Sequence, residues 1–260
     1  MRFMRHEMWS DALFVHFEVD VAGLQQRLPD GLLVDTHNGK AYVGVVALTE
    51  EGIAPWPPGV PLWLVQLLGL SHHAVNVRTY VRPARGSGPP GIYFFSLDCS
   101  ALLPTVGAKA LFNLPYRFAR MRRPRFASTT RDSAVRGLES SRHGSEASLR
   151  AEWDDDEAGA DGDEEDSLGR FLVERYSLYN GSGPLLRWLL RVGQLWGGTI
   201  THVPWPLKRA RLLAWHSTVL QAAGLGDLVL DAEQKPSVVH CSDGVGPIDF
   251  FWRGSVPIRG

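Results

Sequence analysis

A strictly alternating stretch, Val75 to Arg82 (VNVRTYVR), indicates the fold class of this chain. Successive side chains of a strand point to opposite faces, so one face carries valine and threonine and the other carries asparagine, arginine and tyrosine. A turn over 83–90 follows, and Gly91 to Ser100 (GIYFFSLDCS) is expected to return as a second strand. We therefore predict a β-hairpin with one apolar face and one polar-aromatic face.

The N-terminal part of the chain adds three predicted strands. Ala12 to Val19 is rich in aromatic and β-branched residues, which favour strands. Leu32 to Thr36 and Ala41 to Leu48 flank a His-Asn-Gly-Lys sequence, and Asn-Gly supplies the positive φ angles of a tight hairpin turn. The second arm is apolar on both faces, which predicts a central strand, and its Gly44 marks either a bulge or the close approach of another group.

The rest of the chain continues this β-rich pattern. Further strands are predicted around 137–144 (two strands) and at 176–180, 199–207, 211–220 and 238–241, the last before a turn at Ser242, Asp243 and Gly244. Short helices are predicted over 22–28, 104–112 and 167–174, with Ser167 as an N-cap, whereas 185–196 fits either a strand or a helix. Many short strands and few helices predict a mainly β (α+β) fold in a single domain, residues 1–260, wrapped as a barrel or as paired sheets.

Composition excludes several classes of protein. The formal net charge of -1 argues against a general nucleic-acid surface. No apolar run reaches the ~18 residues of a membrane span, and no apolar run follows the N-terminus as a signal peptide requires. We expect a cytoplasmic protein that binds neither membrane nor nucleic acid. Cys99 and Cys241 are then buried thiols or one disulfide, and a homo-oligomer stays open.

Two segments stand out from this background by their composition. Residues 51–70 are rich in proline and tryptophan, which fits either a lid over a cavity or a packed surface loop. Residues 154–166 (DDDEAGADGDEED) are acidic and low in complexity, which predicts a flexible surface loop. The acidic run lacks the ligand spacing of a calcium loop.

No established catalytic motif occurs in the chain, and we predict neither a metal nor a cofactor. His72 and His73 are adjacent, so on a strand they face opposite sides and cannot chelate one ion together. What remains is a set of polar residues at predicted strand ends. They are Asn76, Arg78, Ser96, Asp98, Tyr116, Arg117 and His202. They either face solvent or form a site for an anion or a carbonyl oxygen, with Trp205 among the apolar walls.

The segment from Gly107 to Arg123 (GAKALFNLPYRFARMRR) carries two of these residues. A predicted helix ends before the Leu114-Pro115 step, because proline disfavours helix in the residue before it. Tyr116 and Arg117 follow this rigid turn. They either point into a cavity or begin an exposed basic tail.

Several strings in order resemble the DUF2071 (YqjF-like) family, whose function is unknown. They are LPDGLLVDTHNGKAYVGVV, NVRTYV, PPGIYFFSLDCS, LPYRFARM and HVPWPL, within the range from Trp9 to Asp243. The resemblance implies an acetoacetate decarboxylase-like fold, a curved antiparallel β-structure closed as a barrel or cone around an internal cavity, with a few short helices. The acidic run departs from the family pattern, as does Ala74, where an acidic residue usually stands two positions before the asparagine of NVRTYV.

Acetoacetate decarboxylases use a lysine that forms a Schiff base with the substrate. GAKALFNLPYRFA resembles the stretch that carries it, with Gly107 and Pro115 matched. The two family lysines fall on Tyr116 and Arg117, and neither a phenol nor a guanidinium can form a Schiff base. Lys109 stands where the family has arginine, and whether it reaches the cavity stays open.

Two hypotheses follow. In the first, the cavity binds a small carboxylate or carbonyl compound. Arg78 or Arg117 holds the carboxylate, Tyr116 hydrogen-bonds or protonates an enolate oxygen, and no Schiff base forms. The substrate-binding residues are then Asn76, Arg78, Ser96, His202 and Trp205, and the catalytic residues are Tyr116 and Arg117. In the second hypothesis, the protein is a non-catalytic binding or interaction module, Arg78 pairs with Asp98, and Tyr116 caps a buried carbonyl group.

Overall fold

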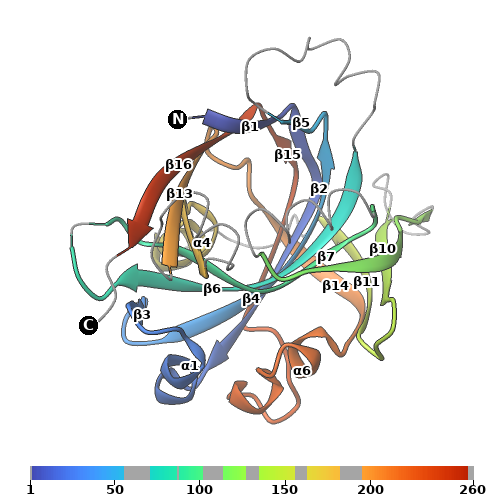
Figure 1. Ribbon diagram of the computed structural model, residues 1–260. Coiled ribbons are helices and arrows are strands. Elements are labelled where there is room, and N and C mark those ends of the chain that lie inside the picture. Colours follow the sequence, from blue (N-terminus) through green and yellow to red (C-terminus); the bar gives the residue numbers. More distant parts are fainter. Residues whose placement is uncertain are drawn as a thin grey trace.

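The structure is a computed structural model that describes residues 2–55, 71–86, 88–101, 114–126, 135–155, 163–181 and 195–256. Strands make up most of these ranges (Figure 1). The strands are β1 (Arg2–His6), β2 (Met8–Val19), β3 (Leu32–Val34), β4 (Ala41–Glu51), β5 (Ala54–Pro55), β6 (His72–Pro83), β7 (Gly91–Cys99), β8 (Tyr116–Arg122), β9 (Arg125–Phe126), β10 (Val135–Arg142), β11 (Ser148–Asp155), β12 (Ser177–Gly181), β13 (Leu195–Thr201), β14 (Lys208–Ser217), β15 (Val238–Val245) and β16 (Ile248–Val256). The helices are α1 (Val21–Arg27), α4 (Asp163–Val173), α6 (Val219–Ala222) and the short 3-10 turn η1 (Gly226–Leu228).

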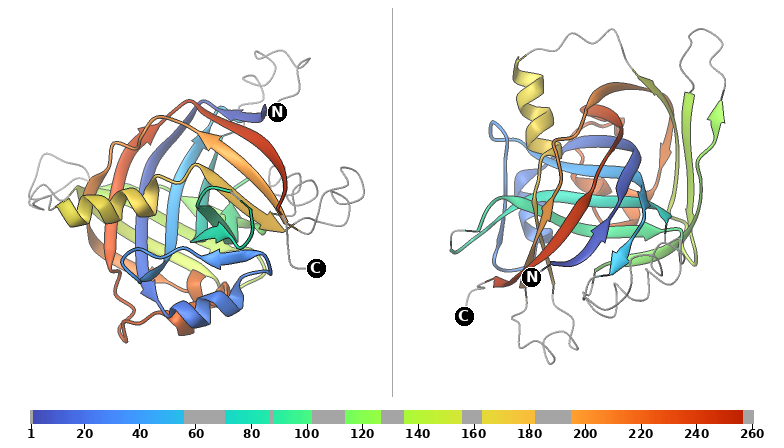
Figure 2. Two further views of the ribbon diagram at one scale, coloured as in Figure 1. Left: turned by 90° about the vertical axis from the view of Figure 1, so that its left-hand side faces the viewer. Right: turned by 90° about the horizontal axis from the view of Figure 1, so that it is seen from above.

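The sheet branches at β7. One edge of β7 pairs with β6, and the other edge pairs with β12 near its start and with β8 at its end. The strands β6, β4, β2, β15, β14, β11, β10, β8 and β7 therefore form a roughly closed ring. The strands β12, β13, β16, β1 and β5 continue from the branch, and we call this second set the arm. Both views of Figure 2 show strands curving around the middle of the molecule, which confirms the predicted mainly β architecture.

The central strands β2, β4 and β6 are buried on both faces. Leu13, Val15 and Phe17 of β2 belong to one core, together with Trp153 of β11. Phe14 of β2 belongs to a second core, which also contains residues of β13 and β16 from the arm. We call the face that carries Leu13, Val15 and Phe17 the ring face, and the face that carries Phe14 and packs against the arm the arm face. Because successive side chains alternate, each central strand supplies side chains to both cores.

Several predicted elements are confirmed. Strand β2 includes the predicted 12–19, α1 matches the predicted turn of helix at 22–28, and β6 pairs with β7 as the predicted antiparallel hairpin. A further hairpin, β10 with β11, lies where two strands were expected. Gly44 marks a close approach, because a Cβ atom there would lie 2.9 Å from the His16 ring. Cys99 and Cys241 are buried and are not joined by a disulfide, so the disulfide alternative is wrong.

Other predictions are corrected by the structure. Asn38 and Gly39 do adopt positive φ angles in a tight turn, but β3 and β4 each pair with β6 and not with one another. Ser242, Asp243 and Gly244 continue β15, where Gly244 with its φ of 145° permits a conformation that other residues rarely adopt. Strands β1 and β16 were not predicted.

The helix and strand limits in the second half of the chain also differ from the predictions. The acidic run 154–166 was expected to be a loop, yet its first residues complete β11, where Asp154 is buried against Arg211, and its last residues begin α4. Ser167 therefore lies inside α4 and is no N-cap. The predicted strand 199–207 ends at Thr201. The predicted strand 211–220 ends at Ser217 with β14, and α6 begins at Val219.

Some predictions fall outside the described residues: the helix 104–112 with Lys109, most of 51–70 and most of 185–196. Within the described part of the chain, no helix is both long enough and apolar enough to cross a membrane.

Candidate functional site

The predicted site residues divide between the two faces of the sheet. Asn76 and Arg78 point to the arm face, in register with Val46 and Gly44 of β4. Tyr116 shares this face, because it aligns with Leu97, which itself aligns with Asn76. Ser96 and Asp98 align with Val77 and Val75 and point to the ring face, and the exposed Arg117 aligns with Asp98. The structure therefore does not bring the whole predicted set together.

On the ring face, Ser96 and Asp98 form a closed network with Arg142 of β10. The Arg142 Nε donates to Asp98 Oδ1 at 3.0 Å, and its Nη2 donates to the Ser96 hydroxyl at 2.7 Å. Burial raises the pKa of Asp98, while the Arg142 charge and its hydrogen bond lower it. Asp98 is thus paired with Arg142. The second hypothesis had expected it to pair with Arg78, and that prediction is wrong. A buried pair whose polar atoms satisfy one another is typical of a structural role.

Arg78 has a different environment on the arm face. Only 9% of this residue is exposed, and its Nη2 donates to the Leu172 carbonyl oxygen at 3.1 Å. The guanidinium carbon lies 6.0 Å from the ring centres of both Phe14 and Tyr80. Its Nε has no hydrogen-bond partner, and no described carboxylate forms an ion pair with it. Arg175, by contrast, is paired with Asp35 at 2.8 Å.

The titratable neighbours of Arg78 do not supply the missing negative charge. Tyr80 donates or accepts one hydrogen bond with His16 Nε2 at 2.8 Å, and burial raises the pKa of its phenol. Burial, together with the charge of Arg78, lowers the pKa of His16. The pKa of His202 is lowered as well, first by burial. These three groups are neutral at pH 7, so none of them compensates the positive charge of Arg78.

His202 and Trp205 belong to an aromatic cluster beside this arginine. Trp205 stacks on Trp9 with ring centres 6.0 Å apart, and it meets Phe14 edge-on at 5.1 Å. His202 packs against Tyr176 at 4.9 Å and against Trp9 at 5.8 Å. Arg78 approaches the same Phe14 ring, so the predicted residues Arg78, His202 and Trp205 do lie together on the arm face.

A second polar cluster lies at the other end of the arm face, and no sequence argument predicted it. Glu50 of β4 is in register with His72 of β6 and with Trp9 of β2. Its Oε2 lies 3.3 Å from His6 Nδ1 and 3.6 Å from His72 Nε2. Trp9 Nε1 donates to His6 Nδ1 at 2.9 Å, so neutral His6 carries its proton on Nε2. Glu50, His6 and His72 are all buried.

Burial shifts the pKa values of this second cluster toward the neutral forms of its groups. Burial raises the pKa of Glu50 to about 7. Burial also lowers the pKa of His6 to about 3 and that of His72 to about 4. The pKa of the partly buried Tyr116 is raised well above its usual range by burial and by the nearby Glu50 and Cys99. In the described part of the chain, no three ligating side chains are arranged to hold a metal ion.

Unpartnered polar atoms concentrate on this face. His72, Asn76 and Arg78 alternate along β6, and each has a buried polar atom without a hydrogen-bond partner among the described residues. His6 Nε2 is in the same state. Buried polar groups in proteins are almost always paired, so such a row indicates a surface that a ligand or water contacts.

The lysines of the described ranges do not lie at these clusters. Lys40 is paired with Glu18, Lys208 with Asp155 and Asp243, and Lys235 with Glu233, all with largely exposed side chains. Lys109 is the one other lysine of the sequence, and it lies outside the described residues.

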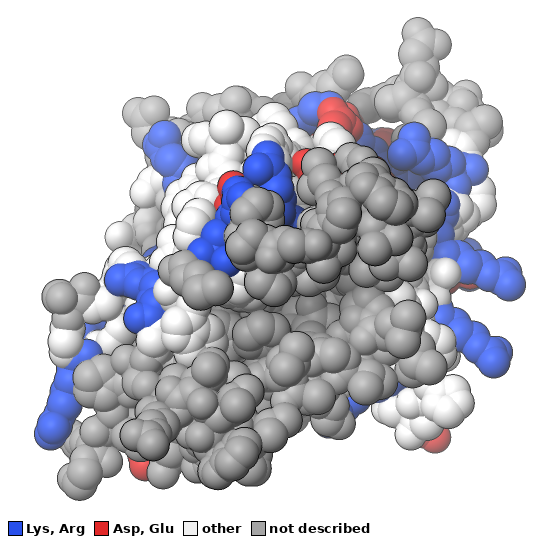
Figure 3. Space-filling model, turned by 45° about the horizontal axis from the view of Figure 1, so that its top comes forward, with Lys and Arg blue, Asp and Glu red and all other residues white. Residues whose placement is uncertain are grey.

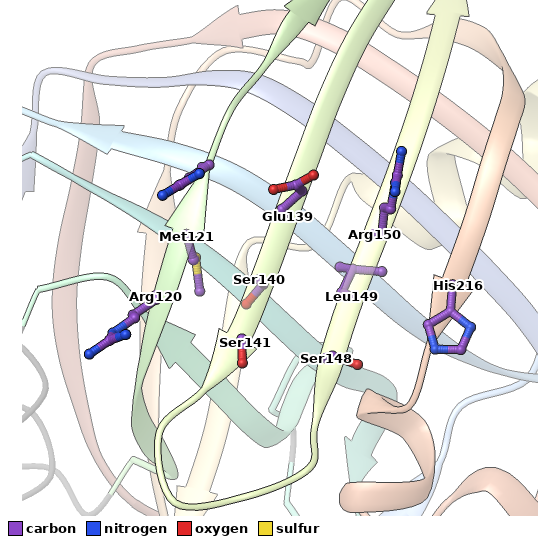
Figure 4. A pocket seen from close by; sticks show the side chains of 10 residues that line it. Arg120, Met121, Glu139, Ser140, Ser141, Ser148, Leu149, Arg150 and His216 are labelled. Carbon is purple, nitrogen blue, oxygen red and sulfur yellow. The ribbon is translucent and has the colours of Figure 1, made fainter.

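A groove of about 330 Å³ crosses the outer surface of β8, β10, β11 and β14 (Figure 4). Arg122, Glu139, Arg150 and His216 form one row of side chains across these strands. Lysine and arginine side chains also project on the side where β10 and β11 lie in Figure 1 (Figure 3). The charged groups of this row are exposed, and none of its described residues has a buried unpartnered polar atom. The groove therefore has weaker features of a binding site than the arm face.

Comparison with known proteins gives relatives in sequence and in fold. The DUF2071 family, described as an uncharacterized conserved protein, matches residues 6–246. The chain is 32% identical to the uncharacterized protein YqjF of Bacillus subtilis (strain 168) over 220 residues, which cover 84% of this chain and 81% of YqjF.

Solved structures resemble this fold at low sequence identity. The enduracididine biosynthesis enzyme MppR with HEPES buffer bound has a TM-score of 0.61 at 13% identity, covering 98% of this chain and 87% of MppR. An acetoacetate decarboxylase-like enzyme from Sphingomonas wittichii RW1 has a TM-score of 0.57 at 16% identity, covering 100% and 94%. Acetoacetate decarboxylase from Legionella pneumophila has a TM-score of 0.57 at 13% identity, covering 97% and 86%. The fold is therefore acetoacetate decarboxylase-like.

Proposed function

The chain belongs to the DUF2071 family, and we propose that it binds a small carboxylate or carbonyl compound on the arm face of its central strands, without forming a Schiff base. The observation that carries this proposal is the buried and uncompensated guanidinium of Arg78. An unpaired buried charge costs several kcal/mol, and a protein that needed only stability would gain by an apolar side chain there. A bound anion removes this cost.

A carboxylate is the anion that best fits this position. Arginine offers carboxylates two parallel N–H groups, and the unpartnered Nε leaves one edge of the Arg78 fork available. Phe14 and Trp205 supply apolar contacts of the kind that line small-molecule sites. MppR, whose solved structures resemble this fold, has been determined in complex with pyruvate, so pyruvate is a suitable first probe here.

The absence of a Schiff base is supported by the chemistry of the matched positions. Tyr116 and Arg117 stand where the resemblance places the family lysines, and neither side chain is an amine. The described lysines are held in surface ion pairs. A carbonyl ligand would then be bound by hydrogen bonds and not by a covalent bond.

Ligand-dependent thermal unfolding tests the binding proposal. Pyruvate, acetoacetate and longer keto acids would be titrated against the wild type, Arg78→Met and Arg82→Met. Arg82 is an exposed residue of the same strand and provides the matched control. At ten times Kd a ligand stabilises the fold by about 1.4 kcal/mol, which raises Tm by about 3 °C for a chain of this length. We expect this shift in the wild type and Arg82→Met but not in Arg78→Met.

The same variants test the alternative of a non-catalytic module with structural polar residues. The closed Ser96–Asp98–Arg142 network favours that role for the ring face. For Arg78 the two roles differ in stability. An arginine without a carboxylate partner can be replaced by methionine at a cost below about 1 kcal/mol, whereas loss of a paired buried arginine costs about 3–5 kcal/mol. A large loss of stability in Arg78→Met with the ligand shifts retained would overturn the proposal.

A further inference from the structure

We propose that Glu50 is a catalytic base that removes a proton from the carbon next to a carbonyl group, and that Tyr116 and His72 hold the carbonyl oxygen. The site then catalyses the reversible enolisation of a neutral ketone. This inference goes beyond the proposed binding at Arg78, because it concerns a different part of the arm face.

The distance along β4 separates the two places. Arg78 is in register with Gly44, and His72 is in register with Glu50. Six residues of a strand span about 20 Å at ~3.3 Å per residue. Val46 and Leu48 lie between them and are buried in the apolar core of this face. A small ligand at Glu50 is therefore bound without help from Arg78, and it needs no carboxylate.

The surroundings of Glu50 are not those of a structural ion pair. Its two nearest basic groups, His6 and His72, are neutral over the physiological range, so no described cation compensates the carboxylate. His6 Nε2 and both ring nitrogens of His72 have no hydrogen-bond partner among the described residues. Water does not reach them freely either, because only 2% of His6 and 5% of His72 is exposed. A buried carboxyl group with unpartnered donors beside it adds little to stability. It does provide the parts of an enolisation site.

Each of these groups can take one role in the reaction. The C–H bond next to the carbonyl breaks, its proton moves to the Glu50 carboxylate, and the electron pair is delocalised onto the carbonyl oxygen. That oxygen accepts hydrogen bonds from the Tyr116 hydroxyl and from an N–H of His72. The reverse step returns a proton from Glu50 to the carbon, or a deuteron once the carboxyl group has exchanged with heavy water, so no reactant other than the solvent is needed. A carboxylate base with neutral donors in an apolar site is an established arrangement for ketone enolisation.

The protonation states agree with this assignment of roles. A base works best when its pKa lies near the working pH, and that of Glu50 is about 7. The titratable groups near it are His6 of β1, His72 of β6 and Tyr116 of β8, and Cys99 of β7 lies near Tyr116. The histidines have pKa values of about 3 and 4, and the raised pKa of Tyr116 keeps its hydroxyl protonated as a donor.

Hydrogen–deuterium exchange in heavy water tests the proposal. Acetone, 2-butanone and cyclohexanone, which carry no carboxylate, would be incubated with the protein, and loss of the α-proton signals would be followed by NMR. We expect the wild type to accelerate exchange and Glu50→Gln to lose at least ~100-fold of that acceleration, the usual contribution of a general base. The control Glu233→Gln changes an exposed carboxylate and should exchange as the wild type does.

Three further measurements make the outcome decisive. Glu50→Asp keeps the carboxyl group but withdraws it by one methylene. This variant should still fold, and it should catalyse the exchange more slowly than the wild type does. The wild-type rate should rise with pH and level off above about 7, because the reaction needs the ionised form of Glu50 and the pKa of this residue is about 7. Arg82→Met, which removes an exposed charge from the strand that carries His72, should keep the exchange, and because the three ketones have no carboxylate the test does not depend on the proposed carboxylate site. Wild-type exchange no faster than buffer for all three ketones, or a Glu50→Gln rate equal to that of the wild type, would overturn the inference.

Discussion

Replacing Glu50 by glutamine should make the protein more stable at neutral pH and leave it nearly unchanged at acid pH. The pKa of Glu50 rises from 4.5 to about 7 on folding, so the folded protein holds this proton more tightly than the unfolded chain. The contribution of Glu50 to stability is therefore fully present below pH 4.5 and is lost as the pH rises to about 7. A difference of about 2.5 pKa units corresponds to about 3 kcal/mol, which Glu50→Gln should recover at pH 8.

Unfolding in urea at pH 4.5, 6 and 8 measures this effect, with thermal unfolding as a second readout. For a chain of this length, about 3 kcal/mol raises Tm by roughly 6 °C. The lowered pKa values of His6 and His72 reduce stability below pH 6.5, but they do so in wild type and variant alike. The difference between the two proteins therefore isolates Glu50. Parallel curves, with the same difference at pH 4.5 and pH 8, would refute the reasoning, because an exposed or cation-paired glutamate gives no such divergence.

Three other predictions concern the fold and the proposed absence of a Schiff base. Gly44→Ala should destabilise the protein by about 1–3 kcal/mol in urea unfolding, because the new methyl group would lie 2.9 Å from the buried His16 ring. Arg142→Met leaves the buried Asp98 carboxylate without its partner and should cost about 3–5 kcal/mol, whereas the exposed Arg150→Met should change stability by no more than about 0.5 kcal/mol. Borohydride with pyruvate or acetoacetate should leave the intact mass of the wild type unchanged, and an adduct that disappears in Lys109→Arg would show that a Schiff base does form.

The parts of the fold that local chemistry determines were predictable from the sequence. The alternation of Val75 to Arg82 correctly placed Asn76 and Arg78 on one face, because strand periodicity depends only on neighbouring residues. The approach of another group to Gly44 was one of two alternatives, and the structure identifies the group as the His16 ring. The turn at Asn38 and Gly39 was also predicted correctly, but the predicted pairing of the two strands that flank it was wrong. Strand partners depend on distant segments, and β3 pairs with β6.

Segments that have the composition of a turn or a loop but lie in a strand of the folded protein were predicted wrongly. Ser242, Asp243 and Gly244 have the composition of a turn, yet pairing with β2 on one edge keeps them in a strand. Asp154 lies in an acidic run that resembles a mobile loop, yet its bond to Arg211 holds it in β11. A partner elsewhere in the chain decides both cases, and no window of sequence contains that partner.

The candidate site shows the same limit more sharply. Tyr116 and Arg117 are adjacent, so on strand β8 they point to opposite faces, and only Tyr116 reaches the arm face. His6, Glu50 and His72 are far apart in sequence and come from three strands. The one available signal was that Glu50 continues the apolar arm-face side of β4, where a carboxylate is unexpected. Recognising it requires knowing how far that strand extends.

The contrast between the two faces supports the proposal that the arm face binds a ligand. On the ring face, the buried acid Asp98 and the buried base Arg142 contact one another directly. On the arm face, the buried base Arg78 and the buried acid Glu50 lie about 20 Å apart along the strands, and neither has an opposite charge among the described residues. Selection for stability alone favours either pairing such groups or replacing them by apolar residues of similar volume. Two separate groups without an opposite charge on one buried face are instead the arrangement that ligand binding and proton transfer require. Substituting Arg78 and Glu50 one at a time tests which of these two roles each residue has.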